Sequence, residues 1–517
     1  MSQNGDNISS EMKAVPTESV STIDRTGSEI ASQRQDDALD FLKQHKGEVQ
    51  AENPNSSSLA RSLRKRIDLR LMPFLCACYT LNFIDKVLLN YAKIMGLEAS
   101  LHLAGNDYSN ASSAFYIAVL LFSLPNMWLL NRVPVAKCLA VNLIGWGLCS
   151  ACHAAIRNNA GLVAVRVLSG AFESGIPPAL MLLSSQYFTY SEQAPRFAYW
   201  YMGMGNGQIL GALISFGFQH MSPTAPLSSW KTMFLVLGLV TMTVGLLVLL
   251  FVPDSPMKAK FLSNTEKIAL LEHIKVNQTG IDSRKFHPGQ LLEGLLDPGC
   301  WGIFLLILLQ SSGSGVVTAY SATILTSFGY TPKQAALLNI PSGVVNIIWT
   351  LSAAVIVRYH GRRWLINVGA GTVATMAAAL LSFLPKTNRP GLLAGMYLIN
   401  VLPGASNIAF QWLTCNTAGH TKRTYATAGM NAAFAIGNII GPLTFRAKDA
   451  PQFKPAKLTL VIMWAVSILV SACCAFYYHW MNKSRTRTIE VVEDEVEASK
   501  AYAGLTDKEN KSFVYRL

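Results

Sequence analysis

The sequence predicts an all-α membrane protein with twelve transmembrane helices, arranged as two bundles of six. Of its 517 residues, 51% are hydrophobic and only 14% are charged, whereas soluble proteins carry about 25% charged residues. The hydrophobic residues come in runs of about 20, the length at which a helix crosses about 30 Å of hydrocarbon. Twelve such runs are present, and a polar segment separates the first six from the last six.

The twelve expected spans define the domain organisation. A six-helix bundle is expected over residues 67–252 and another over 298–482, joined by a polar cytosolic linker at 253–297. Residues 1–66 are rich in Ser, Asp, Glu and Gln, which predicts a disordered tail, and residues 483–517 are expected to form a solvated C-terminal tail. The expected spans are 71–95, 109–131, 135–156, 160–187, 197–219, 230–252, 299–327, 334–357, 363–384, 391–415, 424–446 and 458–480.

The net charge of +13 is explained better by a membrane than by nucleic acid. Most Lys and Arg residues lie in short loops between the hydrophobic runs, and the side that carries both termini has more of them. The positive-inside rule therefore places both termini in the cytosol. We expect a multi-pass protein in a lipid bilayer with no nucleic-acid partner. One loop is an exception, because it puts four basic residues on the other side: Arg446, Lys448, Lys454 and Lys457.

The two halves repeat each other. The stretch GQILGAL at 207–213 matches GNIIGPL at 437–443, and LLNRVPVAK after the second span matches VIVRYHGRR after the eighth. Both matches fall at nearly the same offset, in corresponding spans. This pattern indicates a parallel repeat about an axis normal to the membrane, with a central cavity between the halves.

Four charged residues inside the expected spans are the strongest functional signal. Asp85 and Lys86 lie near the middle of the first span, and Arg166 and Glu173 lie seven residues apart in the fourth, on one helix face. Each costs at least about 2.5–3.5 kcal/mol at the bilayer centre unless it faces protein or water. One interpretation is a set of ion pairs that brace the bundle. We favour the other, in which Asp85, Glu173 and Arg166 couple protons while Lys86 and Arg166 bind an anion, because ionisable groups inside a membrane are usually functional.

Further polar residues are weaker candidates. Five amides in the spans are candidate substrate ligands, although hydrogen bonds between helices explain them equally well: Gln208, Gln310, Asn407, Gln411 and Asn431. Six charged residues near the cytosolic ends of spans are candidates for a cytosolic gate, although membrane anchoring is the alternative: Arg132, Glu192, Arg196, Arg358, Arg362 and Arg363.

Other chemistry is not indicated. Three histidines lie at the ends of spans, where we expect solvated roles: His153, His360 and His420. No spacing of Cys and His residues indicates a metal site, and no nucleophile–base constellation indicates an enzyme. We therefore expect no cofactor and no metal.

Several stretches of the core, about residues 67–482, match those of a known family. They are FIDKVLLNYAKIMGL, RVLSGAFESGIPP, VPDSPMKAKFL, VNQTGI and AGHTKRT, the last followed by GNIIGP and DAP. With these stretches the core resembles the major facilitator superfamily and, more narrowly, is similar to the fungal allantoate permease group of the anion:cation symporters. The resemblance implies a two-bundle transporter in the plasma membrane that takes up a small organic anion together with protons. Allantoate, ureidosuccinate and vitamin-type carboxylates are examples of such cargo, and we expect a monomer.

The resemblance also assigns roles to positions. Related sugar-acid symporters handle protons and carboxylate with an Asp-Arg pair in the first span and an Arg and a Glu seven apart in the fourth, here Asp85, Lys86, Arg166 and Glu173. Lys86 replaces the commoner Arg. Gly211-Ala212 stands where drug antiporters carry Gly-Pro, which favours a symporter. An exporter or facilitator of the same fold, or a nutrient receptor that does not transport, is the alternative.

Overall fold

The computed structural model describes residues 57–222, 224–274, 287–385, 387–449, 453–489, 506–510 and 513–517, and their regular secondary structure is helical throughout, as predicted. The disordered tail predicted for 1–66 falls largely outside these residues. Residues 57–66 belong to the first helix, which begins before the predicted span.

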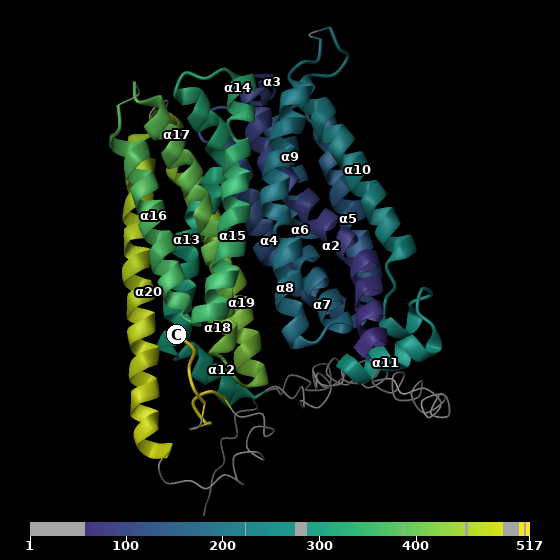
Figure 1. The fold of residues 1–517 in the computed structure, drawn as a ribbon. Helices are drawn as coiled ribbons and strands as arrows, with labels where there is room; N and C mark the ends of the chain where they lie inside the picture. Colours follow the sequence, from purple (N-terminus) through teal and green to yellow (C-terminus); the bar gives the residue numbers. More distant parts are fainter. Residues whose placement is uncertain are drawn as a thin grey trace, which may run out of the picture. The chain divides into compact units, whose positions relative to one another are not determined.

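The helices of the first half follow the predicted spans closely (Figure 1). The fourth predicted span is broken at Ser174 and Gly175, directly before Pro177 and Pro178, in keeping with the effect of proline on helices. The elements are α2 (Ser57–Ile94), α3 (Leu97–Ser100), α4 (Asp107–Arg132), α5 (Val135–Cys152), η1 (His153–Ala155), α6 (Asn159–Glu173), α7 (Ile176–Tyr187), α8 (Tyr190–Tyr201), α9 (Gly203–Phe218) and α10 (Ser229–Phe251).

The polar segment between the halves contains short helices in its described part, and the second half repeats the pattern of the first. The elements of the segment are η2 (Pro256–Lys258), α11 (Asn264–Ile274) and α12 (Pro288–Leu295). Those of the second half are α13 (Pro298–Ser327), α14 (Pro332–Leu337), α15 (Ile340–His360), α16 (Arg363–Phe383), α17 (Arg389–Leu398), η4 (Ile399–Val401), α18 (Leu402–Cys415), α19 (His420–Thr444), η5 (Ala447–Asp449) and α20 (Lys454–Ile489).

Within the described residues, ten helical segments are long and apolar enough to cross a membrane. The other two predicted spans, 197–219 and 424–446, are also helical but are not among the ten. The first is divided at Met202 into α8 and α9, so that neither helix reaches the full length. The second, α19, is 25 residues long but includes Lys422, Arg423 and several Thr and Asn residues. Both lie beside long spanning helices, α9 against α2 and α19 against α13.

The internal repeat appears in the packing of glycines. Gly207 and Gly211 of α9 lie against α2, and the matching Gly437 and Gly441 of α19 lie against α13. A Cβ atom at Gly207 would lie 2.8 Å from the carbonyl oxygen of Thr80, so only glycine permits this approach of the two backbones. The structure therefore gives the repeated sequences the same packing role in each half.

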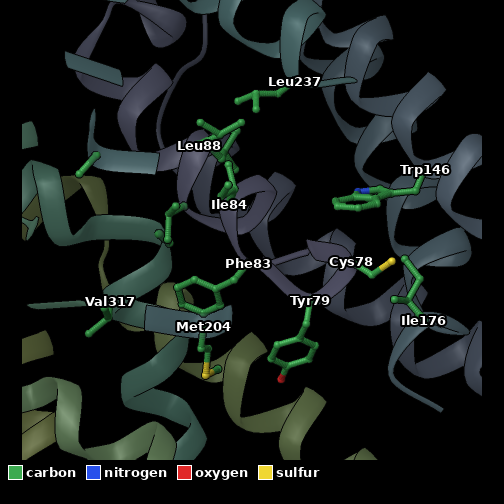
Figure 2. Packing of buried hydrophobic residues seen from close by; sticks show 14 of the residues in the cluster. Cys78, Tyr79, Phe83, Ile84, Leu88, Trp146, Ile176, Met204, Leu237 and Val317 are labelled. Carbon is green, nitrogen blue, oxygen red and sulfur yellow. The ribbon is translucent and has the colours of Figure 1, made fainter. Parts of the chain in front are cut away.

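The halves meet mainly through three helix pairs, α2 with α13, α4 with α19 and α9 with α15, and α14 and α15 also contact α9 and α8, respectively. One buried hydrophobic cluster contains residues of both halves. Figure 2 shows how α2 contributes to it: Phe83 lies on the side of Met204 and Val317, whereas Cys78 lies on the side of Trp146 and Ile176. α2 therefore contacts the second half as well as its own.

The two ends of the bundle carry different elements. The linker face is the end that carries the start of α2 together with α11 and α12, and the opposite face is the end that carries α3 and α14 (Figure 1).

Candidate functional site

The four charged residues of α2 and α6 form two buried ion pairs. Lys86 Nζ lies 2.6 Å from Glu173 Oε1, and Arg166 Nη1 lies 3.6 Å from Asp85 Oδ2. Asp85, Arg166 and Glu173 are only 2–3% exposed. The seven-residue spacing of Arg166 and Glu173 thus puts both side chains on one face of α6, as predicted, and each reaches a partner on α2.

The two pairs are satisfied to different degrees. Lys86 Nζ also donates a hydrogen bond to Asn82 Oδ1 at 3.0 Å, and Asp85 Oδ1 accepts one from Ser150 Oγ at 2.9 Å. The guanidinium of Arg166 lies 4.4 Å from the ring centroid of Phe115, but its 3.6 Å distance to Asp85 is too long for a hydrogen bond. Among the described residues, Arg166 Nε and Nη1, Asp85 Oδ2 and Glu173 Oε2 are buried without a hydrogen-bond partner. The site therefore keeps donors and acceptors that a ligand or a proton can use.

Lys86 differs from the other three in accessibility. Its side chain is 16% exposed, against 2–4% for Asp85, Arg166 and Glu173. Of the four side chains, that of Lys86 is therefore the most accessible.

A small cavity lies between the halves near this site. Phe83 of α2 and Gln208 of α9 line it from the first half, and Ser314, Thr318, Asn346 and Asn400 provide polar groups from the second. Its volume is about 10 Å³, room for about one water molecule. Of the predicted ligands only Gln208 lines it. Sequence reasoning missed the polar groups of the second half, because nothing in their spacing distinguishes them from other buried polar residues.

The remaining predicted amides have different surroundings. Gln310 donates to Asn367 Oδ1 at 3.1 Å and accepts from Ser406 Oγ at 3.4 Å, which are the hydrogen bonds between helices that the alternative interpretation expects. Asn407, Gln411 and Asn431 are half-buried on α18 and α19.

The prediction of a solvated role is wrong for His153. This residue is fully buried, and its ring stacks on Phe234 with centroids 4.3 Å apart. Its Nδ1 lies 3.1 Å from the carbonyl oxygen of Cys149 and 3.2 Å from that of Ser150, so Nδ1 carries the proton and Nε2 is left as a buried acceptor. A residue at the end of a span is expected to face solvent, but η1 packs against α10, and His153 is buried there. His360 is exposed, as expected.

Two of the six predicted gate residues form ion pairs at the linker face. Nε and Nη2 of Arg196 donate hydrogen bonds to the two carboxylate oxygens of Asp68, at 2.6 and 2.7 Å. Glu192 Oε1 lies 2.9 Å from Arg64 Nε and 3.1 Å from His273 Nε2. Burial alone would raise the pKa of Glu192. The main-chain N–H of Thr189, together with His273 and Arg64, outweighs that effect, so the pKa lies below its usual value. These contacts join α8 to α2 and α11 and do not cross to the second half.

The other four gate residues have different environments. Arg132 lies over the ring of Trp128 on its own helix, 4.5 Å from the centroid. Arg358 and Arg362 are exposed. The main-chain N–H of Arg363 donates to the carbonyl oxygen of Leu517 at 2.7 Å. The structure therefore does not bring the six residues together as a single latch.

The expectation of a solvated C-terminal tail is wrong for residues 506–510 and 513–517. Lys422, which is fully buried, holds Asp507 at 2.7 Å together with Asp297 at 2.7 Å and Glu293 at 2.8 Å. The pKa of Lys422 is raised, because these carboxylates outweigh the effect of its burial. The main chain of Tyr515 exchanges hydrogen bonds with Asn482. The end of the chain is thus built into the linker face of the second half.

Hydrogen bonds between the halves gather toward the opposite face in the described part of the chain. Asn90 donates to Ser321 Oγ at 2.7 Å, Tyr108 donates to the carbonyl oxygen of Ala319 at 2.8 Å, and Ser109 bonds with Tyr320. The ion pairs described at the linker face lie within one half or between a half and the linker. The halves are therefore latched near the opposite face.

Two buried ion pairs inside the first of two repeated bundles of membrane-length helices indicate a multi-spanning membrane transporter. The model of the Major Facilitator Superfamily matches residues 75–442, and the chain belongs to this family. It is therefore a transporter rather than an enzyme.

Two relatives from Saccharomyces cerevisiae match most of the chain. The thiamine pathway transporter THI73 is 35% identical over 463 residues, covering 89% of this chain and 87% of its own. Allantoate permease is 30% identical over 470 residues, covering 88% of this chain and 86% of its own. The predicted resemblance to the allantoate permease group is confirmed.

Solved structures confirm the fold. A bacterial homologue of the human lysosomal transporter Spinster, inward-facing and occupied, has a TM-score of 0.61 at 13% identity, covering 78% of this chain and 96% of its own. The xylose transporter XylE from E. coli, in a partially occluded inward-open conformation, has a TM-score of 0.61 at 16% identity, with the same coverage of 78% and 96%.

Proposed function

We propose that this transporter is a proton-coupled symporter that imports a small organic anion by alternating access. It would act as a monomer in the plasma membrane, with the linker face and both termini in the cytosol. The observation that carries the proposal is the buried arrangement of Lys86 with Glu173 and Arg166 with Asp85.

The charges of the four groups explain why protons and anion would bind together. With all four ionised, they sum to zero. A proton on Glu173 leaves the charge of Lys86 uncompensated, and an unpaired charge at this depth costs at least about 2.5–3.5 kcal/mol. A substrate carboxylate next to Lys86 removes that cost. Since 1.36 kcal/mol is a factor of ten in affinity, the proton would raise anion affinity by about 100-fold, and the anion would raise proton affinity equally.

The roles of the four groups follow from their chemistry. Lys86 is the accessible cation and the primary contact for the carboxylate. Arginine side chains in proteins remain positively charged, so Arg166 would serve as a fixed counter-charge for Asp85 and as a second donor to the anion through its Nη1, which has no hydrogen-bond partner. Asp85 and Glu173 would carry the protons. Gln208 would contact the cargo from the central cavity, with Asn407, Gln411 and Asn431 as further ligands.

The distribution of contacts fits alternating access. The halves are hydrogen-bonded near the opposite face, through Asn90, Tyr108 and Ser109, which is the arrangement of a transporter closed to the outside. In the other state the linker face would close, and the exposed Arg358 and Arg362 would then find partners on the first half.

The names of the relatives guide the choice of cargo. Allantoate permease matches 88% of this chain, which supports a small organic anion such as allantoate or ureidosuccinate. The second yeast relative is named for the thiamine pathway. Thiamine is a cation, and a site that gains positive charge on protonation disfavours it electrostatically.

The test is uptake by proteoliposomes that contain the purified full-length protein. We expect labelled allantoate, or another organic acid of a panel, to accumulate above its outside concentration only when the outside is the more acidic, while thiamine does not accumulate. If the labelled acid only equilibrated across the membrane, the protein would be a facilitator. If the proton gradient drove the acid out, it would be an exporter, and if the acid bound without crossing the membrane, it would be a receptor. Each of these results would overturn the proposal.

A further inference from the structure

A second cavity lies between the halves at the opposite face, away from the central ion pairs. Its volume is about 510 Å³, which is within the range of small-molecule sites. Helices α2, α3 and α4 of the first half and α13 of the second contribute to its walls. Its lining consists of Lys93, Glu98, Leu103, Gly105, Tyr108, Ser109, Tyr320, Thr323, Thr326, Ser327, Phe445 and Phe453.

Lys93 provides a basic side chain in this cavity. Its Nζ lies 3.0 Å from Glu98 Oε1, 4.1 Å from the ring centroid of Tyr108 and 4.6 Å from that of Tyr320. The two rings hold the ammonium in place. The side chain of Lys93 is 14% exposed and that of Glu98 is 43% exposed. If another carboxylate replaced Glu98 in the ion pair with Lys93, water could therefore solvate the side chain of Glu98.

Hydroxyl-bearing residues of the second half, Thr323, Thr326 and Ser327, line the same cavity as Lys93. Thr326 Oγ1 and Ser327 Oγ donate to carbonyl oxygens of their own helix. Thr323 Oγ1 is buried with no hydrogen-bond partner in the described part of the chain. It is therefore a free donor for an acceptor group held by Lys93.

The charge outside the cavity has the same sign. Arg446 and Lys448, together with Asp449, lie between two of the lining residues, Phe445 and Phe453, and Lys454 and Lys457 lie at the start of α20. These four basic residues stand against the positive-inside rule and outnumber the one acidic residue. Basic residues on this side do not help to orient the protein in the membrane. They do raise the local concentration of anions.

The floor of the cavity is the latch between the halves. Tyr108, Ser109 and Tyr320 line the cavity, and the same residues make the hydrogen bonds that join α4 to α13. A ligand in this position therefore lies on the closed outer gate.

We propose that this cavity is an entry site for an organic carboxylate, separate from the central site, in which Lys93 anchors the carboxylate and Glu98 competes with it as an internal substitute. The carboxylate displaces Glu98 from Lys93, accepts a hydrogen bond from Thr323, and waits above the latch until the gate opens. The class of ligand rests on the proposed function; the preference for anions rests on the cavity itself.

The first experiment tests the cavity without a substrate. Thr326→Cys places a thiol on its wall, and the rates of reaction with a sulfonate-bearing and a trimethylammonium-bearing methanethiosulfonate reagent are compared, with the unsubstituted protein giving the background from the native cysteines. We expect the anionic reagent to react about tenfold faster or more, as electrostatic focusing predicts. Adding Lys93→Gln should remove this preference and adding Glu98→Gln should increase it. Equal rates, or a preference unaffected by Lys93→Gln, would overturn the proposal.

The second experiment separates the two sites in transport. In allantoate uptake, Lys93→Gln should raise KM about tenfold with kcat nearly unchanged, as expected for lost electrostatic capture, whereas Lys86→Gln should abolish accumulation. Unchanged KM in Lys93→Gln would contradict an entry role. Normal accumulation in Lys86→Gln would contradict the proposed function while leaving the reagent preference of the cavity intact.

Discussion

Replacing Glu173 by Gln is expected to uncouple transport from the proton gradient without stopping movement of the anion. Glu173 Oε1 lies 2.6 Å from Lys86 Nζ, and Gln keeps the size of the side chain while removing its charge. The variant therefore imitates permanently the state that the unsubstituted protein reaches when Glu173 takes up a proton.

The size of the effect follows from the depth of the pair. The uncompensated charge of Lys86 costs at least about 2.5–3.5 kcal/mol, which a bound carboxylate recovers. In the unsubstituted protein this energy makes anion affinity depend on protonation of Glu173 by about 100-fold. In Glu173→Gln the higher affinity is present at every pH, so a pH gradient no longer changes it.

The assay compares two modes of transport in the same proteoliposomes. Accumulation driven by an acidic outside should be lost, while exchange of labelled for unlabelled allantoate should persist. The matched control is Glu266→Gln, which removes the carboxylate that pairs with Arg66 at 2.8 Å on the linker face and should keep both modes. Normal driven accumulation by Glu173→Gln would refute the coupling role of this residue. The coupling role would also be refuted if Glu173→Gln lost exchange to the same extent as driven accumulation while being as stable as Glu266→Gln.

Three further predictions concern packing and the linker face. Gly205→Ala should slow transport and lower stability by about 1–3 kcal/mol, because the added Cβ would lie 2.7 Å from the carbonyl oxygen of Gly343 on α15. The control Gly217→Ala, which has open space around it, should be neutral or stabilising. Equal changes in the melting temperatures of the two variants would contradict the close contact at Gly205. Asp507→Asn should lower stability by about 1.5–3 kcal/mol, the contribution of a hydrogen bond to a charged group, because Lys422 loses one of the three carboxylates that contact it. An unchanged melting temperature would show that the C-terminal segment does not stabilise the second half. Because the pKa of Glu192 is lowered on folding, its ion pairs contribute stability above its unfolded pKa of about 4.3 and lose it as the pH falls through the folded pKa. Glu192→Gln should therefore be less stable than the unsubstituted protein at pH 7, and the difference should shrink as the pH falls and vanish below the folded pKa. A difference that does not shrink with falling pH would refute this assignment.

The sequence predicted the helices well because their signal is local. Runs of about 20 apolar residues are required by the thickness of the bilayer, and each of the twelve predicted spans coincides with helix. The charged residues were found for the same reason, since Asp85 and Glu173 stand out in apolar surroundings.

The pairing of those residues could not be read from the sequence. Spacing places Arg166 and Glu173 on one face of α6, but the rotation of α6 against α2 decides that Glu173 meets Lys86 and Arg166 meets Asp85. The burial of His153 and of Asp507 depends on contacts with distant segments in the same way. The C-terminal segment has the polar composition of a solvated tail. Its packed position depends on the contact of Asp507 with Lys422, which is distant in the sequence.

The central claim is that an organic anion and protons share the site made by Asp85, Lys86, Arg166 and Glu173. It is tested most directly by adding allantoate, or the acid that accumulates best in the uptake panel, to the purified protein in weakly buffered solution and recording the pH. We predict that binding takes up protons, and that Asp85→Asn combined with Glu173→Gln still binds the anion without this uptake. Binding by the unsubstituted protein with no change in bound protons would contradict the account.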